Sequence, residues 1–314
     1  MAWRGLHLSQ PARLTLADNQ CVITQDQGET RLPLEDIAWI MLDTQQASLT
    51  AALLAACMEA GIALIITDAR HHPNGMALPF HRHHRQAEIA AIQIAATESL
   101  RNRLWQTIIR AKITNQAALL SMLGSQAAPL YAMAERVTPG DPENIEARAA
   151  RHYWQHLFAD FTRQNEADLR NAMLNYGYAI MRAAIARALV AAGLLPAIGL
   201  HHASALNPFN LADDLLEPFR PIVDAMVWRL SNQGPTSQGP TSQGPTNHGP
   251  TNQGALTIEH RRALASVLLE PTRLAETTIT ALLATEQSAT SLAQALDAKS
   301  AKILRLPEPI LTPS

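Results

Sequence analysis

The chain of 314 residues is long enough for one large domain or two ordinary ones, and for a sizeable buried core. Apolar residues make up 47% of it and charged residues 17%, a balance typical of a helix-rich globular protein. The net charge of −2 excludes a strongly basic nucleic-acid-binding protein, so any contact with DNA would need a local positive patch.

Residues 1–78 are predicted to form a small β-rich domain. The segment from Ser48 to Gly61, SLTAALLAACMEAG, has the helical period, a Ser cap and a terminal glycine, and it predicts one helix. Around it, short and partly alternating apolar segments bounded by turn residues predict strands at 12–16, 20–24, 30–34, 38–42 and 63–68.

Residues 79–314 are predicted to form a larger α-helical catalytic domain. Long Ala- and Leu-rich segments predict helices at 87–112, 115–123, 144–164, 166–192, 211–230, 257–270 and 273–298. Strands followed by helices, without regular alternation, indicate an α+β fold rather than a doubly wound sheet. We place the domain boundary in the Pro-, Gly- and His-containing segment 71–85.

A tandem repeat interrupts the helical domain. Residues 234–253 read GPTSQ, GPTSQ, GPTNH and GPTNQ, so that a proline recurs every five residues and forbids a helix. The segment contains nothing that could bury a core. We therefore predict a disordered surface insertion at 233–254.

The chain shows no sign of export or membrane insertion. Its start, MAWRGLHLSQPARL, lacks the apolar stretch of a signal peptide, and no apolar run approaches the ~20 residues that span a bilayer. Cys21 and Cys57 have no metal-binding or redox spacing, and we expect two reduced thiols. These features predict a cytoplasmic protein.

Glu146 is the first candidate for chemistry. Together with Ala150, Tyr153 and Leu157 it recurs at helical spacing, which places a carboxylate on an otherwise apolar stripe. Such a carboxylate is costly to bury unless it is paired or binds a metal. A partly exposed acid in the first turn of a helix remains the alternative.

The segment NPFNLADDLLEPFRP contains a second candidate set. Asp214 and Glu217 are three residues apart and share one face of a helix, where two carboxylates can chelate Mg²⁺ or Mn²⁺. A capping cluster opened by Asn210 or Asp213 is the alternative. Upstream, His201 and His202 are adjacent, so at most one of them is expected to face the same ion.

Five of the twelve histidines fall between residues 71 and 84, among or beside Arg70, Arg82 and Arg85. No cysteine or acid completes a tetrahedral zinc set there. The segment is interpreted either as a basic surface for phosphates or as a solvated linker.

The chain resembles the CRISPR-associated spacer-acquisition integrase, protein one of that set and in particular its type II branch. The resemblance covers most of the chain and rests on three ordered blocks: NIEARAARHYW, NAMLNYGYAIMRAAIARALVAAGLLPAIGLHH and NPFNLADDLLEPFRPIVD. In that family a Glu, a His and an Asp or Glu hold the catalytic metal. Carried over by position, these are Glu146, His202 (the fourth residue of G-x-x-H from Gly199) and Glu217, with Asp214 in support.

The resemblance implies an integrase and endonuclease that inserts short foreign DNA duplexes into the CRISPR array. In each of two transesterifications a DNA 3′-OH attacks a phosphodiester at a repeat boundary, with Mg²⁺ or Mn²⁺ at Glu146, His202 and Glu217. It also implies a homodimer formed through the β domain. Two such dimers would flank the small CRISPR-associated protein two in a heterohexameric complex on double-stranded DNA.

Five arginines are candidates for DNA contacts: Arg82, Arg85, Arg148, Arg151 and Arg220. Arg220 has an equally good alternative, an ion pair with Asp214 or Glu217 that holds the site. Two other functions remain open: a metal-dependent nuclease that only hydrolyses structured DNA, and a non-catalytic DNA-scaffolding subunit whose acids cap helices.

Overall fold

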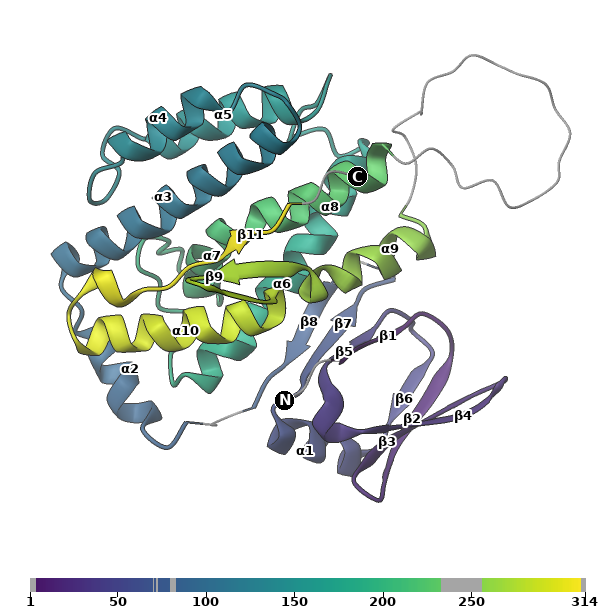
Figure 1. The fold of residues 1–314 in the computed structure, drawn as a ribbon. Helices are drawn as coiled ribbons and strands as arrows, with labels where there is room; N and C mark the ends of the chain where they lie inside the picture. Colours follow the sequence, from purple (N-terminus) through teal and green to yellow (C-terminus); the bar gives the residue numbers. More distant parts are fainter. Residues whose placement is uncertain (1–3, 70, 72, 80–82, 233–255, 312–314) are drawn as a thin grey trace, which may run out of the picture.

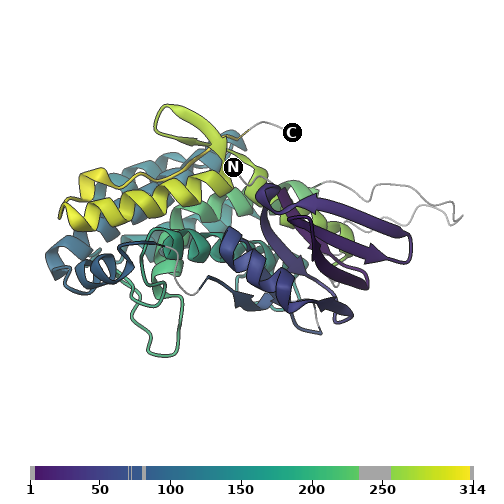
Figure 2. The same ribbon diagram turned by 90° about the horizontal axis from the view of Figure 1, so that it is seen from below.

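The computed structural model describes residues 4–69, 71, 73–79, 83–232 and 256–311. Its β-sheets lie mainly in the first 80 residues, and helices dominate the remainder, which confirms the predicted α+β fold (Figures 1 and 2). The tandem repeat predicted to be a disordered insertion at 233–254 lies outside the described residues.

The N-terminal part contains two four-stranded sheets and one helix, α1 (Ala51–Ala60). The first sheet has the order β1-β5-β7-β8, formed by β1 (Arg4–Leu8), β5 (Ile37–Leu42), β7 (Ala63–Thr67) and β8 (Pro73–Ala77). The second has the order β4-β3-β2-β6, formed by β4 (Gly28–Pro33), β3 (Gln20–Gln25), β2 (Ala12–Ala17) and β6 (Ala47–Leu49). The five predicted strands are confirmed, while β1, β6 and β8 were not predicted.

The predicted start of α1 was two residues early. Thr50 is the cap, because its side chain accepts a hydrogen bond from the Leu53 amide, whereas Ser48 lies in β6. The predicted end is confirmed. Gly61 closes the helix with φ 71°, a left-handed conformation that favours glycine.

Strand β5 links the two parts of the molecule. All six of its residues are buried, as expected for a strand covered on both faces. Trp39 and Met41 pack into the core of the helical part, whereas Ile37, Ile40 and Leu42 pack into a smaller core with α1. The first sheet is therefore shared between two hydrophobic cores.

Nine α-helices follow in the described residues: α2 (Gln86–Ile94), α3 (Glu98–Met122), α4 (Ala128–Arg136), α5 (Ile145–Leu157), α6 (Leu169–Ala191), α7 (Asn210–Leu216), α8 (Arg220–Asn232), α9 (Ile258–Ala265) and α10 (Ala281–Asp297). The prediction of one helix over 87–112 was wrong, because Thr97 caps a new helix there. Helix α3 then continues unbroken to Met122, and α4 was not predicted. Short 3₁₀ turns occupy Leu34–Asp36, Glu217–Phe219, Ser266–Leu269 and Ala301–Ile303.

A small three-stranded sheet lies among the helices. Its order is β10-β9-β11, with β9 (Pro271–Leu274), β10 (Thr277–Thr280) and β11 (Glu308–Pro309). The helix predicted from residue 273 was therefore placed too early, and it begins only at Ala281. The β-branched residues of TTIT favour a strand, and Thr280 caps the helix that follows.

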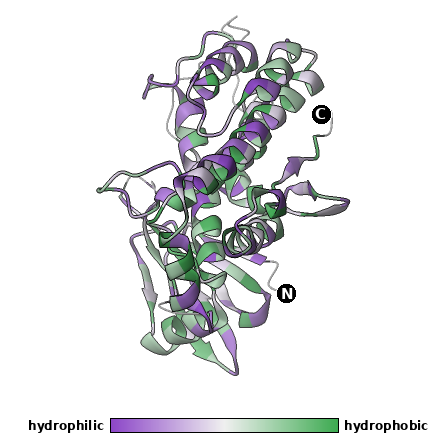
Figure 3. Ribbon diagram, turned by 90° about the vertical axis from the view of Figure 1, so that its left-hand side faces the viewer, coloured by the Kyte–Doolittle hydropathy of each residue, from purple (hydrophilic) through white to green (hydrophobic). Residues whose placement is uncertain are grey.

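Helix α6 forms the centre of the helical part. It packs against α7, α8, α9 and α10, and most of its side chains are buried. Figure 3 shows hydrophilic and hydrophobic residues mixed along the helices of the molecule. None of the helices in the described ranges is long and apolar enough to cross a membrane.

A buried carboxylate connects the N-terminal sheet to α9. The side chain of Asp43, just after β5, is fully buried, and it accepts hydrogen bonds from His7 Nε2 (2.9 Å), His71 Nδ1 (2.8 Å) and Arg261 Nε (2.6 Å). Burial opposes ionisation, but these hydrogen bonds outweigh it and lower the pKa of Asp43. We define these four residues as the Asp43 cluster.

Candidate active site

Two of the predicted acidic ligands meet at one lysine. Lys112 Nζ lies 2.6 Å from Oε1 of Glu146 and 2.5 Å from Oε2 of Glu217, and the lysine side chain is only 8% exposed. The three residues come from α3, α5 and the turn after α7, which are far apart in the sequence. We define Glu146, Lys112 and Glu217 as the Lys112 cluster.

Glu146 lies in the first turn of α5, as expected from the alternative of an acid at a helix start. Its carboxylate is also paired with Lys112. Asp141 caps this helix, because its carboxylate accepts hydrogen bonds from the amides of Ile145 and Glu146, each at 2.9 Å. Ile145, Ala149 and Tyr153, on the adjoining side of the helix, are buried and anchor it in the core. The cap and the core thus fix the position from which Glu146 reaches Lys112.

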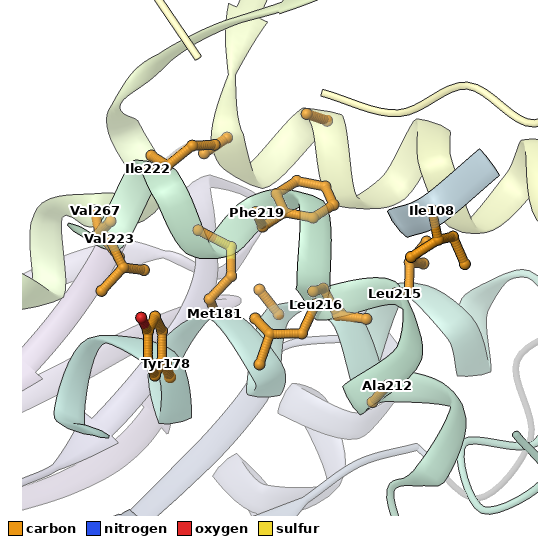
Figure 4. Close-up of a cluster of buried hydrophobic side chains, with 14 of the residues drawn as sticks. Ile108, Tyr178, Met181, Ala212, Leu215, Leu216, Phe219, Ile222, Val223 and Val267 are labelled. Carbon is orange, nitrogen blue, oxygen red and sulfur yellow. The ribbon is translucent and has the colours of Figure 1, made fainter. Parts of the chain in front are cut away.

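Glu217 lies at the break between two helices. Helix α7 ends at Leu216, a 3₁₀ turn covers Glu217–Phe219, and α8 begins at Arg220, so the single helix predicted over 211–230 is interrupted at Glu217 and Pro218. Phe219, Leu215 and Leu216 are buried and anchor this turn in the core, as Figure 4 shows. The break therefore points a carboxylate inward at a place where an apolar side chain would otherwise be expected.

The charge state of Glu217 is set by two cations. Arg220 Nε donates a hydrogen bond of 2.9 Å to Oε1, which realises the structural alternative foreseen for this arginine. Burial opposes ionisation, yet the charges of Lys112 and Arg220 lower the pKa of Glu217 to about 2. The negative charges of Glu217 and Glu146 in turn raise the pKa of Lys112, despite the burial of its ammonium group. Glu217 and Lys112 are therefore both ionised at neutral pH.

His202 is held by Asp214 rather than by the Lys112 cluster. Its Nδ1 atom donates a 2.7 Å hydrogen bond to Oδ1 of Asp214, because a carboxylate can only accept. This hydrogen bond raises the pKa of His202, although burial acts in the opposite direction. In the neutral ring the lone pair then lies on Nε2, and this carboxylate–histidine arrangement is common behind a metal-binding histidine.

Asp214 also organises the loop that carries His202. Its fully buried carboxylate accepts hydrogen bonds from the amides of Leu200 (2.5 Å), His201 (3.1 Å) and His202 (3.1 Å). Gly199 is required at this place, because a Cβ there would lie 2.2 Å from the backbone oxygen of His202. Asp214 thus holds His202 in place, and both of its own oxygens are occupied by these hydrogen bonds.

Further side chains brace the same loop. The Asn210 amide group donates to the carbonyl oxygens of Ala197 (3.1 Å), Ser204 (2.9 Å) and Asn207 (3.1 Å). His201 stacks on the buried Trp105 of α3 with ring centroids 4.3 Å apart and an interplanar angle of 2°. His202 meets the same tryptophan edge-on, with ring centroids 5.7 Å apart, and of the two histidines it is His202 whose ring is held by Asp214.

A pocket of about 210 Å³ adjoins the Lys112 cluster. It is lined by Lys112, Gln116, Ala150, Trp154, Arg163, Tyr178, Glu217, Arg220 and Asp224. Asp224 is fully buried, accepts hydrogen bonds from the hydroxyls of Tyr153 (2.7 Å) and Tyr178, and has its pKa raised by burial to about 6. The pocket thus combines a cationic rim with aromatic walls and a buried acid.

The donor chemistry fits a hard divalent cation. Glu146 and Glu217 converge on one positive group, and Oε2 of Glu217 is buried without a hydrogen bond of good geometry, although the ammonium group is in contact with it. Carboxylate oxygens with one imidazole are donors that Mg²⁺ and Mn²⁺ accept. Within the described ranges, however, no three His, Cys, Asp or Glu side chains form a metal-binding group, so His202 is not gathered with the two glutamates.

The predicted DNA-binding arginines have separate locations. Arg148 and Arg151 are exposed on α5, the helix that also carries Glu146. Arg85 is exposed and pairs with Glu88, Arg220 lines the pocket, and Arg82 lies outside the described residues. The structure therefore brings only Arg220 into the site itself.

Sequence reasoning missed the contribution of α3. Trp105, Lys112 and Asn115 lie along its buried side, and the amide of Asn115 donates to the carbonyl oxygens of Pro218 and Pro307, each at 2.8 Å. A signal was present: Lys112 falls four residues after Ile108, on a stripe that is apolar from Leu104 to Ile109. A lysine there is costly unless acids from another segment face it.

Comparisons with known proteins agree with this architecture. Residues 6–267 match the family described as CRISPR associated protein Cas1. The chain is 43% identical over 236 residues to a CRISPR-associated endonuclease Cas1 from Neisseria meningitidis serogroup C (strain 8013), covering 74% of this chain and 78% of that protein.

Two solved structures are similar in fold. A casposase bound to integration product superposes with a TM-score of 0.75 at 20% identity, over 96% of this chain and 92% of that one. A chain of a Cas6-RT-Cas1–Cas2 complex superposes with a TM-score of 0.72 at 19% identity, over 99% of this chain and 36% of that one. At these identities the two structures support likeness of fold alone.

Proposed function

The chain belongs to the Cas1 family, on its type II branch, and from this premise we propose that it joins short DNA duplexes into a CRISPR array at the repeat boundaries. The observation that carries the proposal is the Lys112 cluster. Two glutamates from distant segments converge on one buried cation beside a pocket of about 210 Å³.

Glu146, His202 and Glu217 are the residues that would hold Mg²⁺ or Mn²⁺. When bound there, the ion would supply activation of the attacking DNA 3′-OH, stabilisation of charge on the phosphate, or both. Asp214 orients His202 through Nδ1, and Arg220 fixes Glu217 through Oε1, so these two of the three proposed ligands are positioned by charged neighbours.

The substrate and partners follow from the family and its relatives. We propose that the protein acts on double-stranded DNA as a homodimer and assembles with the small CRISPR-associated protein two. Support comes from solved relatives in fold, one of which is a casposase bound to integration product and another a Cas1–Cas2 complex. Arg148 and Arg151 are candidates for contacts with the DNA backbone because both are exposed on α5, the helix that carries Glu146.

A strand-transfer assay tests the proposal. Labelled short duplex DNA would be incubated with a plasmid bearing a CRISPR array, the small partner and Mn²⁺, and covalent joining at the repeat edges would be quantified. We expect Glu146→Ala and His202→Ala to abolish joining while DNA binding persists. Glu143→Ala is the matched control, because Glu143 is an exposed acid three residues before Glu146 and pairs with Arg136 at the surface.

The alternatives give different products. Cleavage of the DNA without joining would establish the nuclease, in which water takes the place of the 3′-OH. Joining that survives both substitutions would show that the ligand assignment is wrong. A scaffolding subunit predicts that neither substitution changes any activity.

A further inference from the structure

Lys112 is the feature of the site that the proposed reaction does not use. Its ammonium group contacts both glutamates, at 2.6 and 2.5 Å, and holds together two carboxylates that would otherwise repel each other in a buried setting. The contacts take up one oxygen of each acid. They are oxygens that a divalent ion would also require.

A divalent ion and the ammonium group cannot share these oxygens. Like charges in contact repel strongly where water is excluded, and the Lys112 side chain is 8% exposed and that of Glu217 only 6%. The contact with Oε2 of Glu217 is an ion contact without a good hydrogen bond, since this oxygen is otherwise unpaired. The Lys112 ammonium group therefore neutralises the charge of the Glu217 carboxylate without making a directed hydrogen bond to Oε2.

Gln116 provides a second position for the ammonium group. It lies one turn after Lys112 on the same face of α3 and lines the same pocket. Gln116 is 2% exposed, and its Oε1 atom is buried without a hydrogen-bond partner. An unpaired acceptor is costly to bury, and a lysine four residues away can reach it.

From these contacts we propose that Lys112 is an internal counter-ion that competes with divalent metal for Glu146 and Glu217, and that turns toward Gln116 when metal binds. The proposal rests on the metal role proposed above for the two glutamates. Lys112 is then a positioning residue, because it holds the acids in place and sets how tightly metal binds.

Metal binding itself tests the proposal. Free Mn²⁺ would be titrated into the full-length protein and followed by electron paramagnetic resonance, with thermal melting in parallel. Lys112→Met keeps the length of the side chain and removes its charge. We expect about tenfold tighter Mn²⁺ binding than in the wild type, a lower melting temperature without Mn²⁺, and a larger rise in melting temperature when Mn²⁺ is added.

Two further variants keep the test decisive even if Lys112→Met folds poorly. Lys112→Arg retains the charge and is expected to bind Mn²⁺ no more tightly than the wild type. Gln116→Leu removes the second position without touching the Lys112 contacts, and we expect it to weaken Mn²⁺ binding several-fold. Unchanged or weaker binding in Lys112→Met, together with unchanged binding in Gln116→Leu, would overturn the proposal.

Glu146→Gln separates this inference from the proposed function. If it abolishes Mn²⁺ binding while Lys112→Met fails to tighten it, only the role of Lys112 is wrong. If Glu146→Gln binds Mn²⁺ as the wild type does, the metal site and the function built on it both fail.

Discussion

The molecule contains two charged clusters built around buried carboxylates, and they differ in how completely the acids are satisfied. In the Asp43 cluster both carboxylate oxygens receive hydrogen bonds, from His7, His71 and Arg261, in the region between the N-terminal sheet and α9. In the Lys112 cluster one oxygen of Glu217 has only an ion contact, and a pocket adjoins it.

This difference separates a structural role from a functional one. A carboxylate with every oxygen paired stabilises the fold, because its burial is offset by directed bonds. A buried carboxylate oxygen that has only an ion contact, beside a pocket, can exchange that cation for another. Substitutions in the first cluster should therefore change stability, and substitutions in the second should change activity.

The largest effect is expected from Glu146→Gln. Replacing the Glu146 carboxylate with an amide should lower the rate of DNA joining by at least about 10³-fold, because the site would lack one charged ligand. Its side chain is 27% exposed and Lys112 keeps Glu217 as a partner, so the free energy of unfolding should change by less than about 1 kcal/mol. Single-turnover joining assays and urea unfolding measure the two quantities; a large loss of stability would contradict the functional assignment.

Asp43→Ala should produce the opposite pattern. It leaves Arg261 buried at the junction of the two parts without its carboxylate, which should lower the free energy of unfolding by about 4 kcal/mol. The Asp43→Ala variant should still join DNA when the assay is run well below its melting temperature. Arg261→Met serves as the control, since it removes the charge from the other side of the pair. A variant as stable as the wild type would show that the cluster does not connect the two parts.

The next effect concerns pH and Asp224. Its pKa of about 6 in the folded protein lies above the ordinary value of 3.8, so the folded state holds the proton more tightly. This contribution to stability is fully present below pH 3.8 and is lost as the pH rises through 6. Between pH 4 and 7, Asp224→Asn should therefore gain about 3 kcal/mol relative to the wild type. Urea unfolding at several pH values measures the difference; parallel curves would contradict the raised pKa.

The smallest effect is expected from Asp214→Asn. The amide oxygen can still accept the hydrogen bonds made to one carboxylate oxygen, but the amide nitrogen cannot accept those made to the other, and His202 loses its charged partner. Joining should fall about 10- to 100-fold and metal affinity should fall with it. Asp213→Asn is the matched control, because that neighbouring acid pairs instead with Arg182 and Asn207. Equal losses in both variants would argue against a specific role for Asp214.

Much of the fold could be predicted from local patterns. Alternating apolar residues marked five strands of the N-terminal part, and Gly61 marked the end of α1. Short strands such as β6 and β11 were missed because three or two residues carry too little periodicity. The hairpin at 271–280 was absorbed into the helix that follows it, since its TTIT strand precedes an Ala- and Leu-rich run directly.

The site could be predicted only in part. Sequence and family resemblance selected Glu146, His202 and Glu217; the structure brings the two glutamates together at Lys112, but in the described ranges it does not gather His202 with them. Lys112 and Asn115 belong to a helix without any motif, and their roles depend on which segments the fold brings next to them. Contacts between residues more than 100 positions apart, such as Asn115 with Pro218, have no local signal.

The most direct test compares the two clusters in one experiment. Rates of strand transfer and melting temperatures would be measured together for wild type, Glu217→Gln and Asp43→Asn, with the small partner and Mn²⁺ present. The account predicts that Glu217→Gln abolishes joining while the protein remains folded, and that Asp43→Asn lowers the melting temperature while joining continues below it. If folded Glu217→Gln still joined DNA, the assignment of the Lys112 cluster to the active site would be contradicted.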